Sequence, residues 1–123
     1  MMRGTVNSRR EAIIRLRTRG PTGHELEVNA VVDSGFTSSL TLPASAIASL
    51  ALVRTSGGQA VLADGSLTQF DLFDAEVQWE GNWRSVVISA VGDEALLGMR
   101  LLAKHELRME VVRGGVVEIT PLP

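Results

Sequence analysis

The stretch Val31-Val32-Asp33-Ser34-Gly35-Phe36-Thr37-Ser38-Ser39-Leu40-Thr41-Leu42-Pro43 places a carboxylate directly after an apolar run. Residues 25–32 alternate between polar and apolar side chains and then become fully apolar, which is typical of a strand entering a core. Asp33 is therefore expected in a low-dielectric environment, where Gly35 permits a sharp turn and close approach of a ligand or second chain. Taken alone, Asp-Ser-Gly is a common turn, in which the aspartate bonds its own backbone.

Short extended segments flank this stretch on both sides. Period-2 alternation predicts strands over 12–17 and 25–32, with extended chain at 39–42. Pro43 favours the start of a short helix over 44–50. Two hairpins are predicted, one joining 59–62 to 67–70 around Asp64-Gly65 and one joining 75–79 to 83–88 across 80–82. Gly57 and Gly58 are expected to break the chain before the first hairpin.

The C-terminal third continues the same pattern. Residues 95–98 predict a short apolar strand that ends on Gly98, and 99–105 predict two helical turns. Strands are expected over 106–112 and 116–119, separated by Gly114-Gly115. Many short strands with frequent turn signals predict an all-β fold, a small closed or partly open β-barrel with one or two short helices.

The order of three motifs resembles a known family, the single-domain retropepsin-like aspartic proteases of clan AA. Residues 31–43 resemble the family's Asp-Thr/Ser-Gly loop and the strand after it. Residues 96–102, Leu-Leu-Gly-Met-Arg-Leu-Leu, resemble its apolar-apolar-Gly element and the following helix. Between them, Ala63-Asp64-Gly65-Ser66 lies where the family has its flap hairpin. The resemblance spans residues 10–112.

The resemblance implies a retropepsin-type barrel that fills residues 1–123 as one domain. It implies an aspartic endopeptidase that cleaves a peptide or protein substrate and needs no cofactor or metal. Because catalysis in the family uses two facing aspartates and this chain has one such loop, the active form would be a homodimer. The implied site residues are Asp33 as the catalytic residue, Ser34, Gly35 and Gly98 as supports of its loop, and Ala63, Asp64, Gly65 and Ser66 as the substrate-covering flap.

The sequence departs from the family pattern at three points. Phe36 stands where the family usually has alanine, Arg100 comes one residue later than the retroviral arginine, and the chain has no tyrosine. A second function therefore stays open, a non-catalytic dimeric module that binds peptides on the same fold. Residues 116–119 are also open to two interpretations, as part of a dimer interface or as a strand paired within its own chain.

Composition excludes several other classes of protein. A chain of 123 residues has room for one domain, and the absence of cysteine removes disulfides and thiol chemistry. No apolar run is long enough for a membrane span and the start lacks an apolar signal segment, so we expect a cytoplasmic protein without a membrane partner. Six of the twelve basic residues precede residue 20. Arg15 and Arg17 alternate with apolar residues, so a solvent-facing strand is favoured over a nucleic-acid site.

The histidines and tryptophans carry weaker signals. His24 and His105 have no neighbouring metal ligands in the sequence, which favours structural roles. Trp79 and Trp83 flank a tight turn and are expected either to pack across the two strands or to form a contact surface. Val61, Leu62 and Leu67 suggest pockets for apolar substrate side chains.

Overall fold

A computed structural model describes all of residues 1–123 and contains ten strands and two short helices. In chain order these are β1 (Met2–Val6), β2 (Ala12–Arg19), β3 (Glu25–Val32), β4 (Leu40–Thr41), α1 (Ala44–Ser49), β5 (Arg54–Val61), β6 (Leu67–Trp79), β7 (Asn82–Ser89), β8 (Leu96–Leu97), α2 (Met99–Leu102), β9 (His105–Met109) and β10 (Val116–Pro121). The prediction of an all-β fold with short helices is confirmed.

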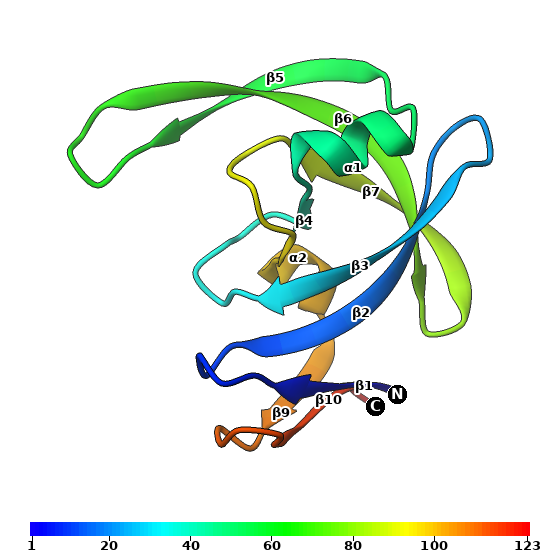
Figure 1. The fold of residues 1–123 in the computed structure, drawn as a ribbon, viewed down its shortest axis with the longest axis vertical. Helices are drawn as coiled ribbons and strands as arrows, with labels where there is room; N and C mark the ends of the chain where they lie inside the picture. The colour runs from blue at the N-terminus through cyan, green and yellow to red at the C-terminus, as the bar shows by residue number, and fades with distance from the viewer.

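The strands form one strongly curved sheet (Figure 1). Its order is β5-β6-β7-β4-β8-β3-β2-β1-β10-β9. β6 is thirteen residues long and serves two parts of the fold. Its first half pairs with β5, while its second half pairs with β7 and, at Val77 and Glu76, with β2. This last pairing curls the sheet back on itself, which gives the partly open barrel that the strand pattern predicts.

Alternating burial along β2 shows why this segment is a strand. Ile14 and Leu16 are almost fully buried, whereas Arg15 and Arg17 point to solvent. Each arginine lies within 3.4 Å of an acidic side chain on β3, Glu27 for Arg15 and Glu25 for Arg17. Opposite charges that face each other on two antiparallel strands stabilise this register modestly. The solvent-facing interpretation of these two arginines is confirmed.

One apolar core holds the barrel together. It contains 21 buried residues drawn from both halves of the chain. Its largest fully buried members are Ile14, Leu16, Leu40, Leu42, Leu50, Val77, Ile88, Leu97, Leu101, Val117 and Ile119. No helix of the chain combines the length and the hydropathy needed to cross a bilayer.

The two ends of the chain are paired within the molecule. β1 lies between β2 and β10, and β10 also pairs with β9 (Figure 1). The N-terminal ammonium group lies 2.6 Å from Glu80 Oε2. Of the two interpretations left open for residues 116–119, the structure shows pairing within the chain.

Several predicted boundaries are wrong. Gly57 and Gly58 do not break the chain but lie inside β5. The helix predicted over 99–105 ends at Leu102, because Ala103 leaves the helical region and Lys104 adopts a φ of 66°. The strand expected to reach residue 112 ends at Met109. β1 was not predicted, because five residues with one glycine give little periodicity.

Candidate active site

The loop after β3, residues 33–39, is called the Asp33 loop here. Asp33 is half-buried, and its N–H donates to the carbonyl oxygen of Leu97 at 2.9 Å. Its Oδ1 accepts the N–H of Gly35 at 2.9 Å, which is the bond that an ordinary Asp-Ser-Gly turn makes. Its Oδ2 accepts no hydrogen bond from the chain. One carboxylate oxygen therefore holds the turn while the other is available to a ligand.

The Asp33 loop has little freedom to move, because Gly98 lies against it. A Cβ atom at residue 98 would lie 2.0 Å from the carbonyl oxygen of Ser38 and 2.6 Å from Cδ2 of Phe36. The N–H groups of Gly98 and Met99 donate to the carbonyls of Ser39 and Phe36 at 2.9 and 2.8 Å. Only glycine fits between the loop and α2, and hydrogen bonds hold the loop's backbone at Phe36 and at Ser39.

The other two residues expected to support Asp33 lie at the exposed apex of its loop. Ser34 is exposed, and its hydroxyl has no hydrogen-bond partner within the chain. A Cβ atom at Gly35 would lie 3.2 Å from Asp33 Oδ1, so glycine at this position allows the N–H to approach the carboxylate. Ser34 is thus free to contact a second molecule, whereas Gly35 serves the geometry of the turn.

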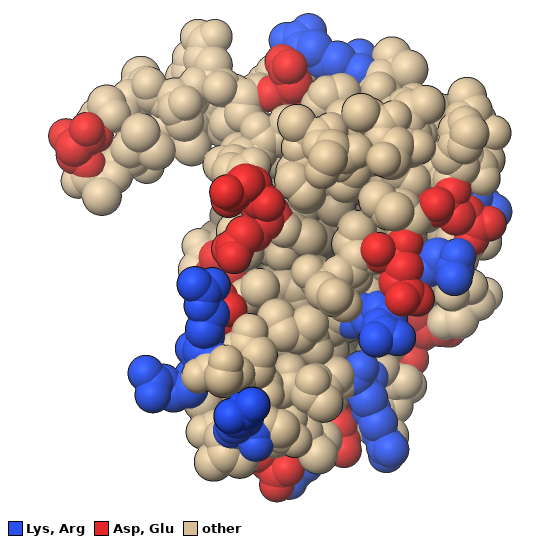
Figure 2. Space-filling view, in the orientation of Figure 1, with Lys and Arg blue, Asp and Glu red and all other residues tan.

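A hairpin formed by β5 and β6 projects from the barrel on the same side as the Asp33 loop (Figures 1 and 2). At its base, Arg54 Nε lies 2.7 Å from Asp71 Oδ1, next to a β-bulge between Arg54 and Ser56. Its strands then run in regular register from Ser56 opposite Leu72 to Val61 opposite Leu67. The hairpin is therefore fixed at the barrel and free at its tip.

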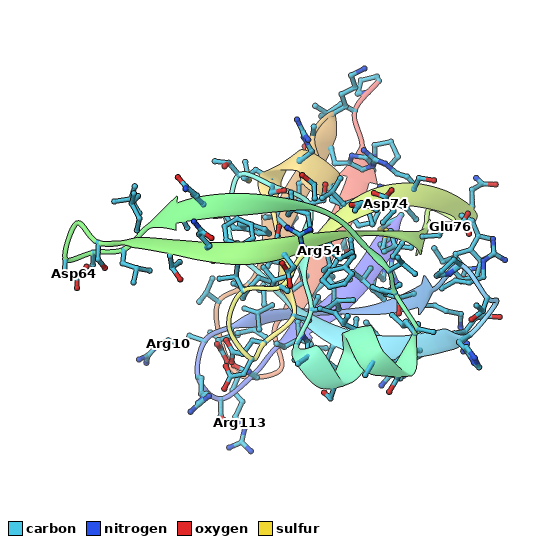
Figure 3. All side chains as sticks on the ribbon, turned by 90° about the horizontal axis from the view of Figure 1, so that it is seen from above. Arg10, Arg54, Asp64, Asp74, Glu76 and Arg113 are labelled. Carbon is cyan, nitrogen blue, oxygen red and sulfur yellow. The ribbon has the colours of Figure 1, made fainter.

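The tip of the hairpin is the predicted turn, residues 63–66. All four residues are exposed, and Gly65 has a φ of 84°, which favours glycine. Asp64 lies at the far end of the hairpin (Figure 3), where its Oδ1 accepts both the N–H and the hydroxyl of Ser66. These two bonds lower the pKa of Asp64 below its ordinary value. Within one chain, the structure does not bring the tip to Asp33.

Between the Asp33 loop and the β5–β6 hairpin lies a cleft of about 800 Å³. The loop side supplies Asp33, Gly35, Phe36, Thr37 and Ser38, and the hairpin supplies Gly58, Gln59, Ala60, Val61, Phe70 and Leu72; the remaining lining residues are Thr41, Val87, Ser89, Val91, Leu96 and Arg100. The walls are mainly apolar, and the only ionisable residues are Asp33 and Arg100. Such a lining suits a largely apolar ligand that contacts a single carboxylate.

The apolar residues of the hairpin contribute unequally to the cleft. Phe70 and Leu72 are half-buried and line it, while Leu67 is 64% exposed and does not. A Cβ atom at Gly58 would lie 2.8 Å from the ring of Phe70, so this glycine leaves room for the ring. Of the three apolar residues proposed from sequence, Val61 lines the cleft and Leu62 and Leu67 do not. Sequence reasoning did not identify Phe70 or Leu72.

Phe36 does not obstruct the Asp33 loop. Its ring occupies the space that a side chain at residue 98 would otherwise fill, and it also lines the cleft. The pairing of a large residue at 36 with glycine at 98 is therefore a matched packing arrangement. Phe36 adds apolar surface to the cleft beside Asp33.

The remaining sequence candidates have structural roles. Nε2 of His105 accepts the indole N–H of Trp79 at 3.2 Å, and its Nδ1 lies 2.8 Å from the carbonyl oxygen of Ala103. A neutral imidazole protonated on Nδ1 satisfies both bonds. The expected packing of Trp79 against Trp83 is wrong, because the register pairs them with Asn82 and Gln78 and puts them on opposite faces. Trp83 instead stacks against Arg19, whose Cζ lies 4.0 Å from the centre of the indole ring.

Comparison by sequence gives no relatives, since no family model and no curated protein matches the chain. Comparison by structure finds proteins with a similar fold. The chain is similar to EIAV protease complexed with the inhibitor HBY-793, at 13% identity and a TM-score of 0.55, over 80% of this chain and 90% of that one. It is also similar to a retropepsin-like aspartic protease from Rickettsia conorii, at 14% identity and a TM-score of 0.60, over 99% and 91%. The chain has the fold of the retropepsin-like aspartic proteases.

Proposed function

We propose that the chain is an aspartic endopeptidase that acts as a homodimer, in which two copies of Asp33 share one proton. The observation that carries this proposal is the position of Asp33, which lines an apolar cleft under a projecting hairpin with one carboxylate oxygen unoccupied. The two similar structures are proteases, which supports the same chemistry. Residues 1–123 would then act as one protease domain.

The proposed chemistry needs two carboxyl groups in different protonation states. Two carboxylates about 3 Å apart repel by ~5 kcal/mol at an effective dielectric constant of about 20, so the pair retains one proton. The charged Asp33 takes a proton from a water molecule while the water oxygen forms a bond to the carbonyl carbon of the substrate. The neutral Asp33 of the partner gives its proton to the carbonyl oxygen. The first Asp33 then gives the proton it took from water to the amide nitrogen, the C–N bond breaks, and one hydroxyl proton of the intermediate returns to the partner's Asp33 as the product acid forms.

The other site residues support this chemistry in the proposal. Gly98 and Gly35 hold the Asp33 loop in place, so that the carboxylate reaches the cleft without reorganising. The hydroxyl of Ser34, which is exposed, would bond the partner's loop. Residues 63–66 form the tip of a flap that closes over the substrate and excludes water. The apolar walls favour substrates with apolar side chains next to the cleaved bond.

An Asp33→Asn variant tests the proposal, because it keeps the shape of the side chain and removes its acid–base function. We expect the purified protein to cleave a library of unfolded peptides, as detected by mass spectrometry, and the variant to lose that cleavage while keeping its dimer. Asp74→Asn is the matched control, since Asp74 is exposed on β6 outside the cleft (Figure 3). Equal cleavage by wild type and Asp33→Asn would contradict the proposal.

The same experiment distinguishes the second candidate function from the protease. A non-catalytic dimeric peptide-binding module would bind peptides from the library and release them intact, with wild type and Asp33→Asn behaving alike. Binding is measured on the same library by capture with immobilised protein.

A further inference from the structure

Arg100 is the one cationic side chain that lines the cleft. It is exposed, and its guanidinium group has no ion pair and no hydrogen bond within the chain. Five other arginines lie within 4 Å of an acidic side chain: Arg15, Arg17, Arg19, Arg54 and Arg108. Arg100 therefore presents an uncompensated charge to whatever occupies the cleft.

The backbone of Arg100 is held firmly in place. Its N–H donates to the carbonyl oxygen of Ser38 at 3.2 Å, which ties Arg100 to the C-terminal part of the Asp33 loop. The next two residues, Leu101 and Leu102, are buried in the core and anchor α2. The hydroxyl-bearing residues Thr37 and Ser38 line the same end of the cleft. The cleft thus carries one acidic side chain, Asp33, and one cationic side chain, Arg100.

We propose that Arg100 is a specificity-determining residue that pairs with an acidic side chain of the peptide. This inference rests on the proposed function. A guanidinium group stays charged at all physiological pH values and can bond both oxygens of a carboxylate. The apolar walls, among them Phe36 and Phe70, reduce solvent screening when a peptide fills the cleft. Pairing in the cleft is therefore stronger than pairing at an open surface.

Two-fold symmetry gives this preference a definite pattern. If the two Asp33 residues meet on the two-fold axis of a shared cleft, the two Arg100 residues are related by the same axis and lie one on each side of it. A favoured peptide then carries apolar residues around the cleaved bond and an acidic residue some positions away on either side. An acidic residue next to the cleaved bond is disfavoured, because it faces the charge of the Asp33 pair.

A matched peptide series tests the proposal. One glutamate is moved along a peptide with an apolar centre, and each peptide is compared with its glutamine counterpart, which has nearly the same shape. We expect glutamate to raise kcat/KM about tenfold over glutamine at one position on each side. The gain resides in KM rather than kcat, since the pairing stabilises bound substrate and transition state alike. It decreases as salt is added.

Variants assign the effect to Arg100. Arg100→Gln brings the ratio of kcat/KM for the glutamate and glutamine peptides to about one. With Arg100→Glu, a peptide that carries lysine at the same position becomes a better substrate than the glutamate peptide. Arg84→Gln is the control, because Arg84 is also exposed and unpaired but does not line the cleft; it leaves the ratio as in wild type. A ratio near one in the wild type, or a ratio unchanged in Arg100→Gln, overturns the inference.

A binding measurement keeps this result separate from that of the proposed function. The labelled peptides are titrated with Asp33→Asn protein and followed by fluorescence polarisation. If wild type cleaves nothing but the Asp33→Asn protein binds the glutamate peptide more tightly through Arg100, the inference stands and the protease fails. If the protein cleaves without charge preference, the protease stands and the inference fails. If the protein cleaves nothing and also binds the glutamate and glutamine peptides equally, both the protease and the inference fail.

Discussion

The hydroxyl of Thr41 connects β4 to both ends of the turn that leads into β8. It donates to the carbonyl oxygen of Glu94 at 2.8 Å and accepts the N–H of Leu96 at 2.8 Å, and Thr41 is only 2% exposed. Leu96 and Thr41 both line the cleft. This one side chain therefore fixes the cleft wall that follows the Asp33 loop.

Replacing Thr41 by valine keeps the shape of the side chain and removes both bonds. The variant leaves a part-buried N–H and a part-buried carbonyl without partners, so we expect the free energy of unfolding to fall by about 1–3 kcal/mol. Urea denaturation measures the change. Thr22→Val is the control, since Thr22 is exposed in a turn and its hydroxyl makes no hydrogen bond; its effect stays within about 0.5 kcal/mol.

Replacing Gly98 by alanine forces the Asp33 loop and α2 apart. The new Cβ would meet a backbone oxygen at 2.0 Å, which cannot rotate away. We expect a loss of about 3 kcal/mol in the free energy of unfolding, at the upper end for overpacking, together with loss of cleavage. Gly57→Ala is the comparison, because its Cβ would meet mainly the flexible guanidinium end of Arg54 at 3.0 Å. Equal stability of the two variants would contradict the packing described here.

The hairpin tip gives a prediction about pH. The hydroxyl and N–H of Ser66 lower the pKa of Asp64. The charged carboxylate therefore stabilises the tip at pH values above the ordinary pKa of aspartate. That support is lost as the pH falls through the lowered pKa. Ser66→Ala removes the larger cause, and we expect the pKa of Asp64 to rise toward its ordinary value of 3.8 in an NMR titration. Ser56→Ala, whose hydroxyl lies 3.5 Å from the carbonyl oxygen of Gly57, leaves the titration unchanged.

The pH dependence of cleavage follows from the shared proton. The Asp33 pair works as acid and base only while it holds one proton, so we expect the rate to fall as the pH rises and the second carboxyl group ionises. The measurement is kcat/KM on one peptide across the pH range in which circular dichroism shows the fold intact. A rate that climbs steadily to about pH 10 is incompatible with this chemistry.

The elements closest to the site could be predicted from sequence because each has a local cause. The apolar run before Asp33 and the Leu96-Leu97-Gly98 element were each recognisable as short strands from their own residues, and the structure then pairs them in parallel, Val31 with Leu96 and Val32 with Leu97. The Asp64-Gly65 turn required one positive φ, which Gly65 provides. In each case neighbouring residues alone determine the backbone conformation.

The cleft could not be predicted because its lining depends on contacts distant in sequence. β5 and β6 carry apolar residues on both faces, Phe70 and Leu72 on one and Val61 and Leu67 on the other, and Val61 lines the cleft as well, so alternation alone does not say which residues line it. The glycines at 57 and 58 indicated a break, yet Gly58 serves to accommodate Phe70. A glycine opposite an aromatic residue in a predicted hairpin is a signal that could have identified the inner face.

The pairing of β1 with β10 has a consequence for how an active particle would form. Because each copy completes its own hydrogen-bond ladder, it does not borrow a segment from a neighbour in order to fold. Folding and association are then separate equilibria, so dilution would switch off the proposed dimeric protease while leaving each copy folded, and association would raise the melting temperature as the protein concentration rises. The activity of such a protease would then depend on its own concentration.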